Sequence, residues 1–131
     1  MKRLFLPWLA AFALAGCAKT ATEPSLALVG TWKLVSRQCE CAPAPTPDET
    51  VTFTATGFAF YRNGQFVATG TYATTTAHLC GSPAASPVLR FTYTTVRLPS
   101  ANAAAAVRAN MLVLDYGGEC DAPVDIYQRL L

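Results

Sequence analysis

The chain has 131 residues and a formal net charge of +2, with 52% hydrophobic and 14% charged residues. A chain of this length forms one domain of ordinary size with a core of its own. It carries no basic stripe interleaved with aromatic residues, which argues against a nucleic-acid-binding protein.

The first sixteen residues have the character of an export signal. Lys2 and Arg3 supply a positive start, and residues 4–14 form an apolar run too short to span a bilayer as a mature helix. Small residues then lead directly into Cys17. The segment Leu14-Ala15-Gly16-Cys17 resembles the lipobox of bacterial lipoproteins. An ordinary secretory signal followed by an incidental cysteine is the alternative.

The lipobox resemblance implies a lipid anchor. Cleavage would occur before Cys17, its sulfur would carry a diacylglyceryl group, and the new N-terminus would carry a further acyl chain such as palmitate. Two or more acyl chains give stable membrane anchoring. Ala18 in place of Asp favours, by the same analogy, the outer membrane of the cell envelope, facing the periplasm or the cell surface. We therefore expect a signal peptide over 1–16, an acylated tether over 17–27 and a folded domain over 28–131.

The charge of the mature domain is close to zero. Lys2 and Arg3 leave with the signal, so the remaining basic residues balance the eight acidic ones. The acyl chains on Cys17 are then the expected membrane attachment, since nothing indicates polybasic attraction to lipid.

Four cysteines remain after Cys17, and an even number in an exported chain indicates two disulfides. Zinc is the alternative, but Cys39-x-Cys41 is tighter than the usual C-x(2–4)-C spacing and no second such pair exists. Three pairings are open. On a strand, Cys39 and Cys41 would point to the same face, and a bridge between them would be strained. We therefore expect one to pair with Cys80 and the other with Cys120.

The first part of the domain is rich in strand signals. Residues 28–36 have the β-branched and aromatic content of a strand, whereas alternate prolines exclude residues 42–48 from a strand interior. Residues 51–56 alternate, with Val51 and Phe53 on one face and threonines on the other. This pattern predicts a half-buried strand.

Asn63-Gly64 lies between two alternating apolar segments, which is the strongest short signal for a hairpin. It would join a strand over 58–62 to one over 65–76. A two-residue turn places Phe60 opposite Val67, so that both side chains would point to one face.

The second half alternates less cleanly. Residues 77–87 predict a loop and residues 88–95 a strand. The alanine-rich segment begins with Ser100, a good N-cap, and we interpret it as a short helix near residues 100–109, with a low-complexity loop as the alternative. Strands are expected over 111–116 and 124–130.

Seven or eight strands joined mostly by hairpins, with no βαβ alternation, predict an all-β fold. The expected architecture is a small antiparallel up-and-down β-barrel of 7–8 strands. Closure of the barrel removes exposed strand edges that would otherwise aggregate.

Gly30-Thr31-Trp32 at the start of the first strand resembles the Gly-x-Trp opening of lipocalins. The order of the later segments, from Val51-Thr52-Phe53 to Tyr127-Gln128-Arg129-Leu130, is similar to small lipocalin-like domains of bacterial lipoproteins. In lipocalins this tryptophan packs at the closed end of the barrel under a basic residue of the last strand. The resemblance assigns these barrel-closing roles to Trp32 and Arg129.

No constellation of catalytic residues is present. The single histidine, His78, lies in a loop without a positioned nucleophile, and there is no G-x-S-x-G elbow. Acidic residues around Gly117-Gly118 do not have the spacing of an EF-hand loop. We therefore expect a protein that is not an enzyme and that has no cofactor and no metal.

The aromatic residues support two hypotheses. The first is a barrel that binds a small apolar ligand, with interior positions assigned by alternation as pocket candidates: Phe53, Phe60, Leu89, Phe91, Leu112 and Leu114. A filled core is the alternative use of these side chains. The second hypothesis is a binding or inhibitor module that contacts an envelope protein through its loops. Disulfides that join the 42–48 loop to the 77–87 loop would favour the second.

Overall fold

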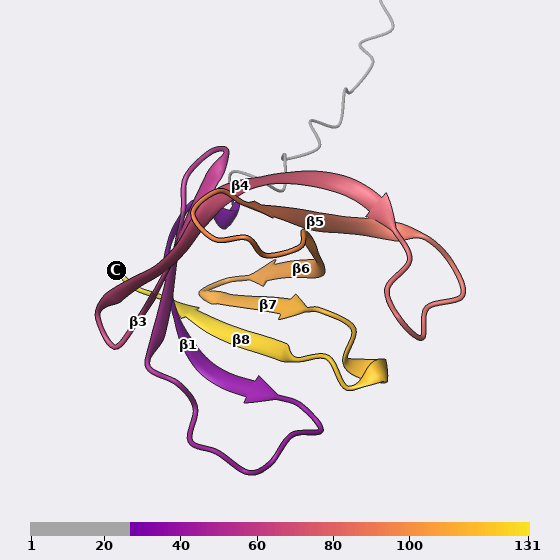
Figure 1. The fold of residues 1–131 in the computed structure, drawn as a ribbon, viewed down its shortest axis with the longest axis horizontal. Coiled ribbons are helices and arrows are strands. Elements are labelled where there is room, and N and C mark those ends of the chain that lie inside the picture. The colour runs from indigo at the N-terminus through magenta and orange to yellow at the C-terminus, as the bar shows by residue number, and fades with distance from the viewer. Residues whose placement is uncertain (1–26) are drawn as a thin grey trace, which may run out of the picture.

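The computed structural model describes residues 27–131, so the signal, Cys17 and the tether up to residue 26 lie outside the described residues. The described chain forms a closed barrel of antiparallel strands, each paired with the next and the last with the first (Figure 1). The strands are β1 (Gly30–Gln38), β2 (Glu49–Phe53), β3 (Gly57–Arg62), β4 (Gln65–Ala77), β5 (Ser86–Tyr93), β6 (Ala101–Arg108), β7 (Met111–Asp115) and β8 (Val124–Arg129). A short 3-10 turn, η1 (Gly118–Cys120), precedes β8. The predicted all-β up-and-down barrel is confirmed, with eight strands.

Alternation along the strands decides which side chains fill the barrel. In β2, Glu49, Val51 and Phe53 are buried, while the threonines between them are only half-buried. Successive side chains of a strand point to opposite faces, so one set faces the interior and the other faces solvent. The polar inward residue in this series, Glu49, belongs to the site described below.

The helix expected near residues 100–109 is wrong, because Ala101–Arg108 is β6. This strand pairs with β5 through three residue pairs and with β7 through five. Ala103 points inward and is fully buried. Helix propensity differs between ordinary residues by no more than roughly 0.7 kcal/mol each. Pairing on both sides and burial of one face outweigh this preference.

The β3–β4 hairpin departs from the predicted register after its first pairs. Tyr61 pairs with Phe66 as a two-residue turn requires, but Phe60 pairs with Ala68 because the register shifts between Phe60 and Tyr61. The prediction that Phe60 faces Val67 is therefore wrong. Val67 is the additional residue of a β-bulge. The bulge places the small Ala68 beside Phe60 in the interior and leaves Val67 at the rim.

The middle of the barrel is a packed core. Its largest fully buried side chains are Trp32, Tyr127, Phe53, Phe91, Leu112, Leu114, Val51 and Val88. The ring of Phe58 meets that of Phe91 edge to face, with centroids 5.2 Å apart. An eight-stranded barrel is just wide enough for side chains of this size, so they fill it.

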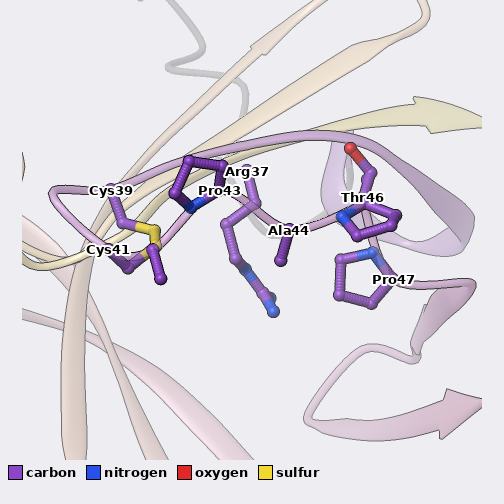
Figure 2. Close-up of a pocket in the computed structure, with 9 residues that line it drawn as sticks. Arg37, Cys39, Cys41, Pro43, Ala44, Thr46 and Pro47 are labelled. Atoms are coloured by element: carbon purple, nitrogen blue, oxygen red, sulfur yellow. A yellow bond between two sulfur atoms is a disulfide. The ribbon is translucent and has the colours of Figure 1, made fainter.

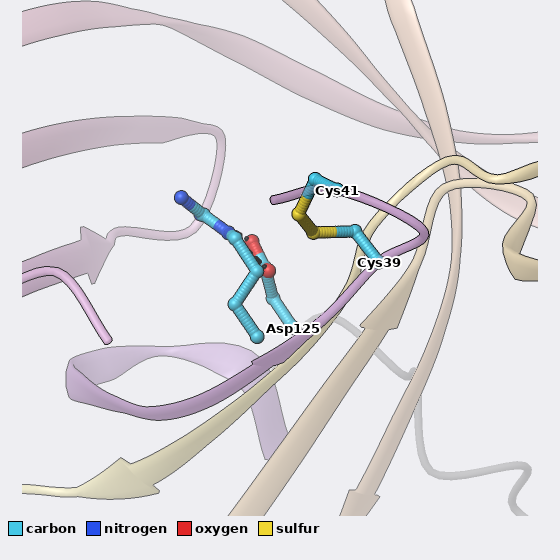
Figure 3. Close-up of a disulfide and its surroundings, with 4 residues drawn as sticks. Cys39, Cys41 and Asp125 are labelled. Carbon is cyan, nitrogen blue, oxygen red and sulfur yellow. Dashed lines mark hydrogen bonds and ion pairs between the residues drawn. A yellow bond between two sulfur atoms is a disulfide. The ribbon is translucent and has the colours of Figure 1, made fainter. Parts of the chain in front are cut away.

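The four cysteines of the domain form two disulfides, but not the expected pairs. Cys80 in the β4–β5 loop is bonded to Cys120 in η1, and their Cα atoms are 5.8 Å apart. Figure 1 shows the β4–β5 loop and η1 on the same side of the molecule. Cys39 is bonded to Cys41 just after β1, with Cα atoms 5.2 Å apart (Figure 3). The expected pairing assumed that Cys39 and Cys41 lie on a strand, whereas the chain bends there.

Candidate ligand site at the open end of the barrel

The open end of the barrel is the end at which β1, β3, β5 and β7 finish and β2, β4, β6 and β8 begin. It contains a cavity of about 430 Å³, a size within the range of small-molecule sites. The lining residues come from the ends of strands around the whole rim. They are Arg37, Glu49, Phe60, Arg62, Val67, Ala68, Tyr93, Leu98, Ala101, Tyr116, Pro123 and Asp125.

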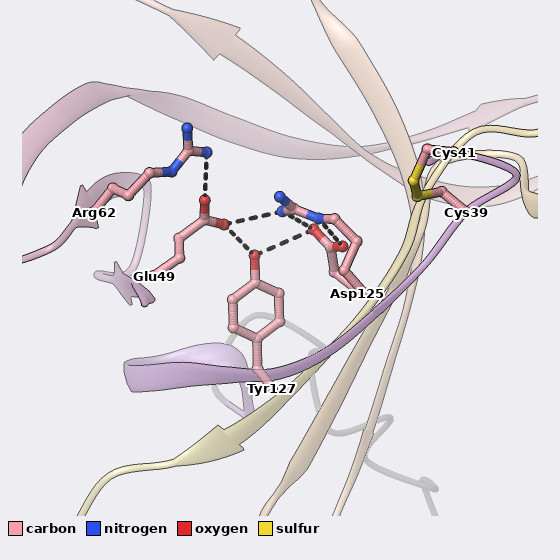
Figure 4. Close-up of polar contacts among 7 residues, drawn as sticks. Cys39, Cys41, Glu49, Arg62, Asp125 and Tyr127 are labelled. Atoms are coloured by element: carbon pink, nitrogen blue, oxygen red, sulfur yellow. Dashed lines mark hydrogen bonds and ion pairs between the residues drawn. A yellow bond between two sulfur atoms is a disulfide. The ribbon is translucent and has the colours of Figure 1, made fainter. Parts of the chain in front are cut away.

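A network of charged side chains connects four strands at this cavity. Arg37 on β1 donates two hydrogen bonds of 2.7 Å to Asp125 on β8, from Nε and Nη2. Its Nη2 also lies 3.2 Å from Glu49 Oε1 on β2, and Arg62 Nη2 on β3 donates to Glu49 Oε2 at 2.8 Å. The Tyr127 hydroxyl donates to Glu49 Oε1 at 3.0 Å. Figure 4 shows Glu49 between Arg62 and Tyr127, at the centre of the network.

The two carboxylates of the network are deeply buried. Glu49 is 4% exposed and Asp125 is 2% exposed. A carboxylate in such a position is stable only if cations and hydrogen bonds replace its water. Arg37 supplies both to Asp125, and the hydrogen bond to Asp125 raises the pKa of Arg37 against the opposing effect of burial. Two arginines and two carboxylates leave the network formally neutral.

Tyr127 and Tyr116 remain protonated at this end. Burial, followed by the charge of Glu49, raises the pKa of Tyr127. Burial, followed by the charge of Asp125, raises the pKa of Tyr116. Both hydroxyls are therefore hydrogen-bond donors over the whole physiological range, and that of Tyr127 is committed to the network.

The cavity also contains donors that the network does not use. Among the hydrogen bonds of the described residues, none involves Nη1 of Arg37, Nε or Nη1 of Arg62, or the hydroxyls of Tyr93 and Tyr116. The carboxylate oxygens of Glu49, by contrast, are already occupied. The site is therefore suited to a molecule with a hydrogen-bond acceptor and an apolar body.

The structure places the six pocket candidates on the inner face of the barrel but in different roles. Phe53, Phe91, Leu112 and Leu114 are fully buried in the core, and Phe60 lines the open-end cavity. Leu89 lines a separate hollow of about 150 Å³ next to Leu28. Sequence reasoning identified the inner face but not the position of the cavity along it.

Sequence reasoning missed the charged network, although the alternation of buried and exposed positions contains its signal. Glu49 lies two residues before Val51, and Asp125 two residues before Tyr127. Each acid therefore shares the inward face of a buried residue. An acidic residue on an inward position requires a partner, which is the physical sign of a buried ion pair.

The closed end, where β1 begins and β8 ends, is sealed by Trp32 and its neighbours. Arg129 lies over the Trp32 ring, with its guanidinium carbon 4.1 Å from the ring centroid. Arg129 also donates to the carbonyls of Val29 at 2.8 Å and Ala27 at 2.6 Å. Gly30 makes room for this arrangement, since a Cβ there would lie 2.5 Å from Nη1 of Arg129.

A second hollow lies under the proline-rich loop between β1 and β2. It has a volume of about 210 Å³ and is lined by the loop and by Arg37. Figure 2 shows Arg37 between the Cys39–Cys41 bridge and Pro47. Arg37 also lines the main cavity, so its side chain borders both hollows.

Two further features of the described chain bear on other functions. Within residues 27–131, no group of three or more His, Cys, Asp and Glu side chains is placed to hold a metal ion. Over the same residues, no helix has the length and apolar character needed to cross a bilayer. His78 is an exposed residue of the β4–β5 loop. Cys17 lies outside the described residues.

The chain matches no protein-family model, no curated protein and no solved structure.

Proposed function

We propose that this protein is a lipid-anchored lipoprotein of the cell envelope whose lipocalin-like barrel binds a small apolar ligand at its open end. The observation that carries the ligand proposal is the 430 Å³ cavity, which lies above a filled core. The anchor rests on the lipobox-like segment that ends at Cys17. Neither part of the proposal requires a catalytic group, cofactor or metal.

The lining of the cavity favours a particular kind of ligand. Phe60, Val67 and Leu98 offer apolar contact at the wall. Arg62 and Tyr93 offer unused donors at the same cavity. An apolar molecule that carries one acceptor group, such as a carboxylate, carbonyl or phosphate, would match both.

The lipocalin-like character is supported by the closed end. Trp32 is fully buried, Arg129 covers its ring, and Gly30 allows the close approach. This arrangement agrees with the roles that the Gly-x-Trp resemblance implies. An antiparallel eight-stranded barrel is compatible with the same assignment.

The alternative is a protein-binding or inhibitor module that acts through its loops. The disulfides give it less support, because neither joins the 42–48 loop to the 77–87 loop. Cys39–Cys41 stays within one connection, and Cys80–Cys120 leads to η1. The cavity is therefore the better-supported site.

The direct test is native mass spectrometry of the protein purified from its own membranes, followed by displacement of a fluorescent apolar probe. Ala101→Phe should fill the cavity and weaken probe binding by about tenfold or more, since Ala101 lines it. Ala106→Phe is the matched control, because Ala106 is exposed on the same strand. Equal probe affinity in both variants would contradict the cavity as the binding site. A stoichiometric protein partner in place of a small molecule would favour the alternative.

A further inference from the structure

Exposed apolar side chains gather around the closed end of the barrel. Val29 is 37% exposed, Met111 37% and Leu130 46%, and Leu131 is fully exposed. We call these four residues the closed-end patch. Backbone hydrogen bonds hold its segments together, because Arg129 donates to Asn110 at 2.8 Å and Leu130 donates to Thr31 at 2.8 Å. A cluster of exposed apolar side chains is typical of a surface that contacts a membrane or another protein.

The charges of the described residues are distributed unequally between the two ends. All acidic residues of this part of the chain lie in the β1–β2 connection, the first residue of β2, the end of β7, the β7–β8 connection or the start of β8. They are Glu40, Asp48, Glu49, Asp115, Glu119, Asp121 and Asp125. None of these side chains lies on the segments of the closed-end patch; Glu119 packs against Gly81 of the β4–β5 loop, which the Cys80–Cys120 bridge joins to η1. Arg108 is exposed beside the patch, at the end of β6. A surface with an exposed arginine and without acidic side chains is suited to anionic lipid head groups.

The chain also enters the barrel at this end. Ala27 and Val29 lie against Arg129 at the start of β1. Cys17 is ten residues before Ala27, which allows a reach of at most about 35 Å. An anchor at Cys17 would therefore hold the closed end at high local concentration near the bilayer.

We propose that the closed-end patch rests on the membrane surface, so that the open end and its cavity face away from the bilayer. The inference rests on the lipid anchor of the proposed function. A second group of exposed apolar residues, including Phe66 and Leu98, lies at the open end. Leu98 lines the cavity, and the group shares its end with the seven acidic residues, which outnumber Arg37, Arg62 and Arg97 there, so the net charge of this end disfavours anionic lipid. The cavity then receives its ligand from the aqueous side.

The test uses the full, acylated protein reconstituted in vesicles of zwitterionic phospholipid with a minor anionic component. A nitroxide label is placed at Asn110→Cys in the β6–β7 turn or at Gln65→Cys beside Phe66. The labels react selectively, since the native cysteines are acylated or bridged. We expect the label at position 110 to be several-fold less accessible to a water-soluble nickel relaxant than the label at 65.

A second pair of variants separates contact from mere proximity. Leu130→Asp should raise the accessibility of the label at 110 to the nickel relaxant, while the protein still floats with the vesicles. Val96→Asp, at an exposed residue of the β5–β6 loop, should not change the label. If the protein floats with the vesicles but the two labels are equally accessible, or the label at 65 is the more protected, the proposed orientation is wrong. The proposed anchor would not be affected by that result. A protein that does not float with the vesicles would overturn the anchor and the orientation with it.

Discussion

At the closed end of the barrel, the charge of Arg129 is met by backbone carbonyls and the face of Trp32. The open end contains two arginines and two buried carboxylates in one network with Tyr127. The first end is filled mainly by apolar side chains, and the hollow beside Leu28 has a volume of only about 150 Å³. The second keeps a cavity of about 430 Å³ above charged groups. The open end therefore combines charged side chains with a cavity, whereas the other end uses its interior mainly for apolar packing.

The difference predicts where the fold is most sensitive to substitution. Loss of Arg37 at the open end leaves Asp125 buried without a cation. Loss of the cation at the closed end leaves an aromatic ring that is already covered by apolar neighbours. The following variants test this contrast in order of expected effect.

Arg37→Met should lower the free energy of unfolding by about 3–5 kcal/mol, since it leaves Asp125 buried without its guanidinium. The measurement is urea denaturation at neutral pH. Arg90→Met is the control, because Arg90 is exposed and its side chain hydrogen-bonds to Asn102 alone among the described residues. It should cost less than about 0.5 kcal/mol. A cost below about 1 kcal/mol for Arg37→Met would mean that Asp125 finds another partner.

Removal of the Cys80–Cys120 disulfide by paired alanine substitution should cost about 4 kcal/mol, because the bond closes a loop across 40 residues. Paired alanine substitution of Cys39 and Cys41 should cost clearly less, since their separation is two residues. Thermal unfolding of the two double variants decides the order. The reverse order would show that the Cys39–Cys41 bridge stabilises the β1–β2 loop and Arg37 by more than the small loop that it closes suggests.

Arg129→Met should lower stability by about 1–2 kcal/mol, the sum expected for a lost cation–π contact and two partly exposed hydrogen bonds. Gly30→Ala should produce a loss in the same direction, because its Cβ would displace Arg129 and its φ of 139° is unfavourable for alanine. For both variants, denaturation followed by Trp32 fluorescence gives the free energy of unfolding, and quenching of that fluorescence shows whether the ring has become more accessible. A loss as large as that of Arg37→Met would remove the contrast between the two ends.

The smallest effect is a dependence on alkaline pH. The pKa of Tyr127 is raised in the fold, so its contribution is complete below the unfolded value of about 10 and is lost as pH rises above it. The free energy of unfolding should fall by about 1.4 kcal/mol per pH unit from this residue. Tyr127→Phe should show a shallower decline above pH of about 10. Denaturation at neutral pH is the reference for both proteins, and an unchanged alkaline slope would contradict the assignment.

The outcomes for particular elements show how far local pattern reaches. Residues 51–56 and the Asn63-Gly64 turn predicted strands and a hairpin, because a period of two is visible in any short window. The alanine-rich segment predicted a helix and is β6, because its neighbours on both sides required a strand. The bulge at Val67 could not be anticipated, since it depends on the space beside Phe60.

The sequence by itself determined the class of fold and the inward face of most strands, and it supplies the lipobox-like segment on which the proposed anchor rests. These properties depend on alternation, turn residues and a short motif, which are local. Only the tertiary structure decided the disulfide partners, the filled middle of the barrel and the cavity above Arg37, Glu49 and Asp125. The charged network joins side chains from β1, β2, β3 and β8, and the Cys80–Cys120 bridge joins the β4–β5 loop to η1. Contacts across such separations are settled only when the barrel closes.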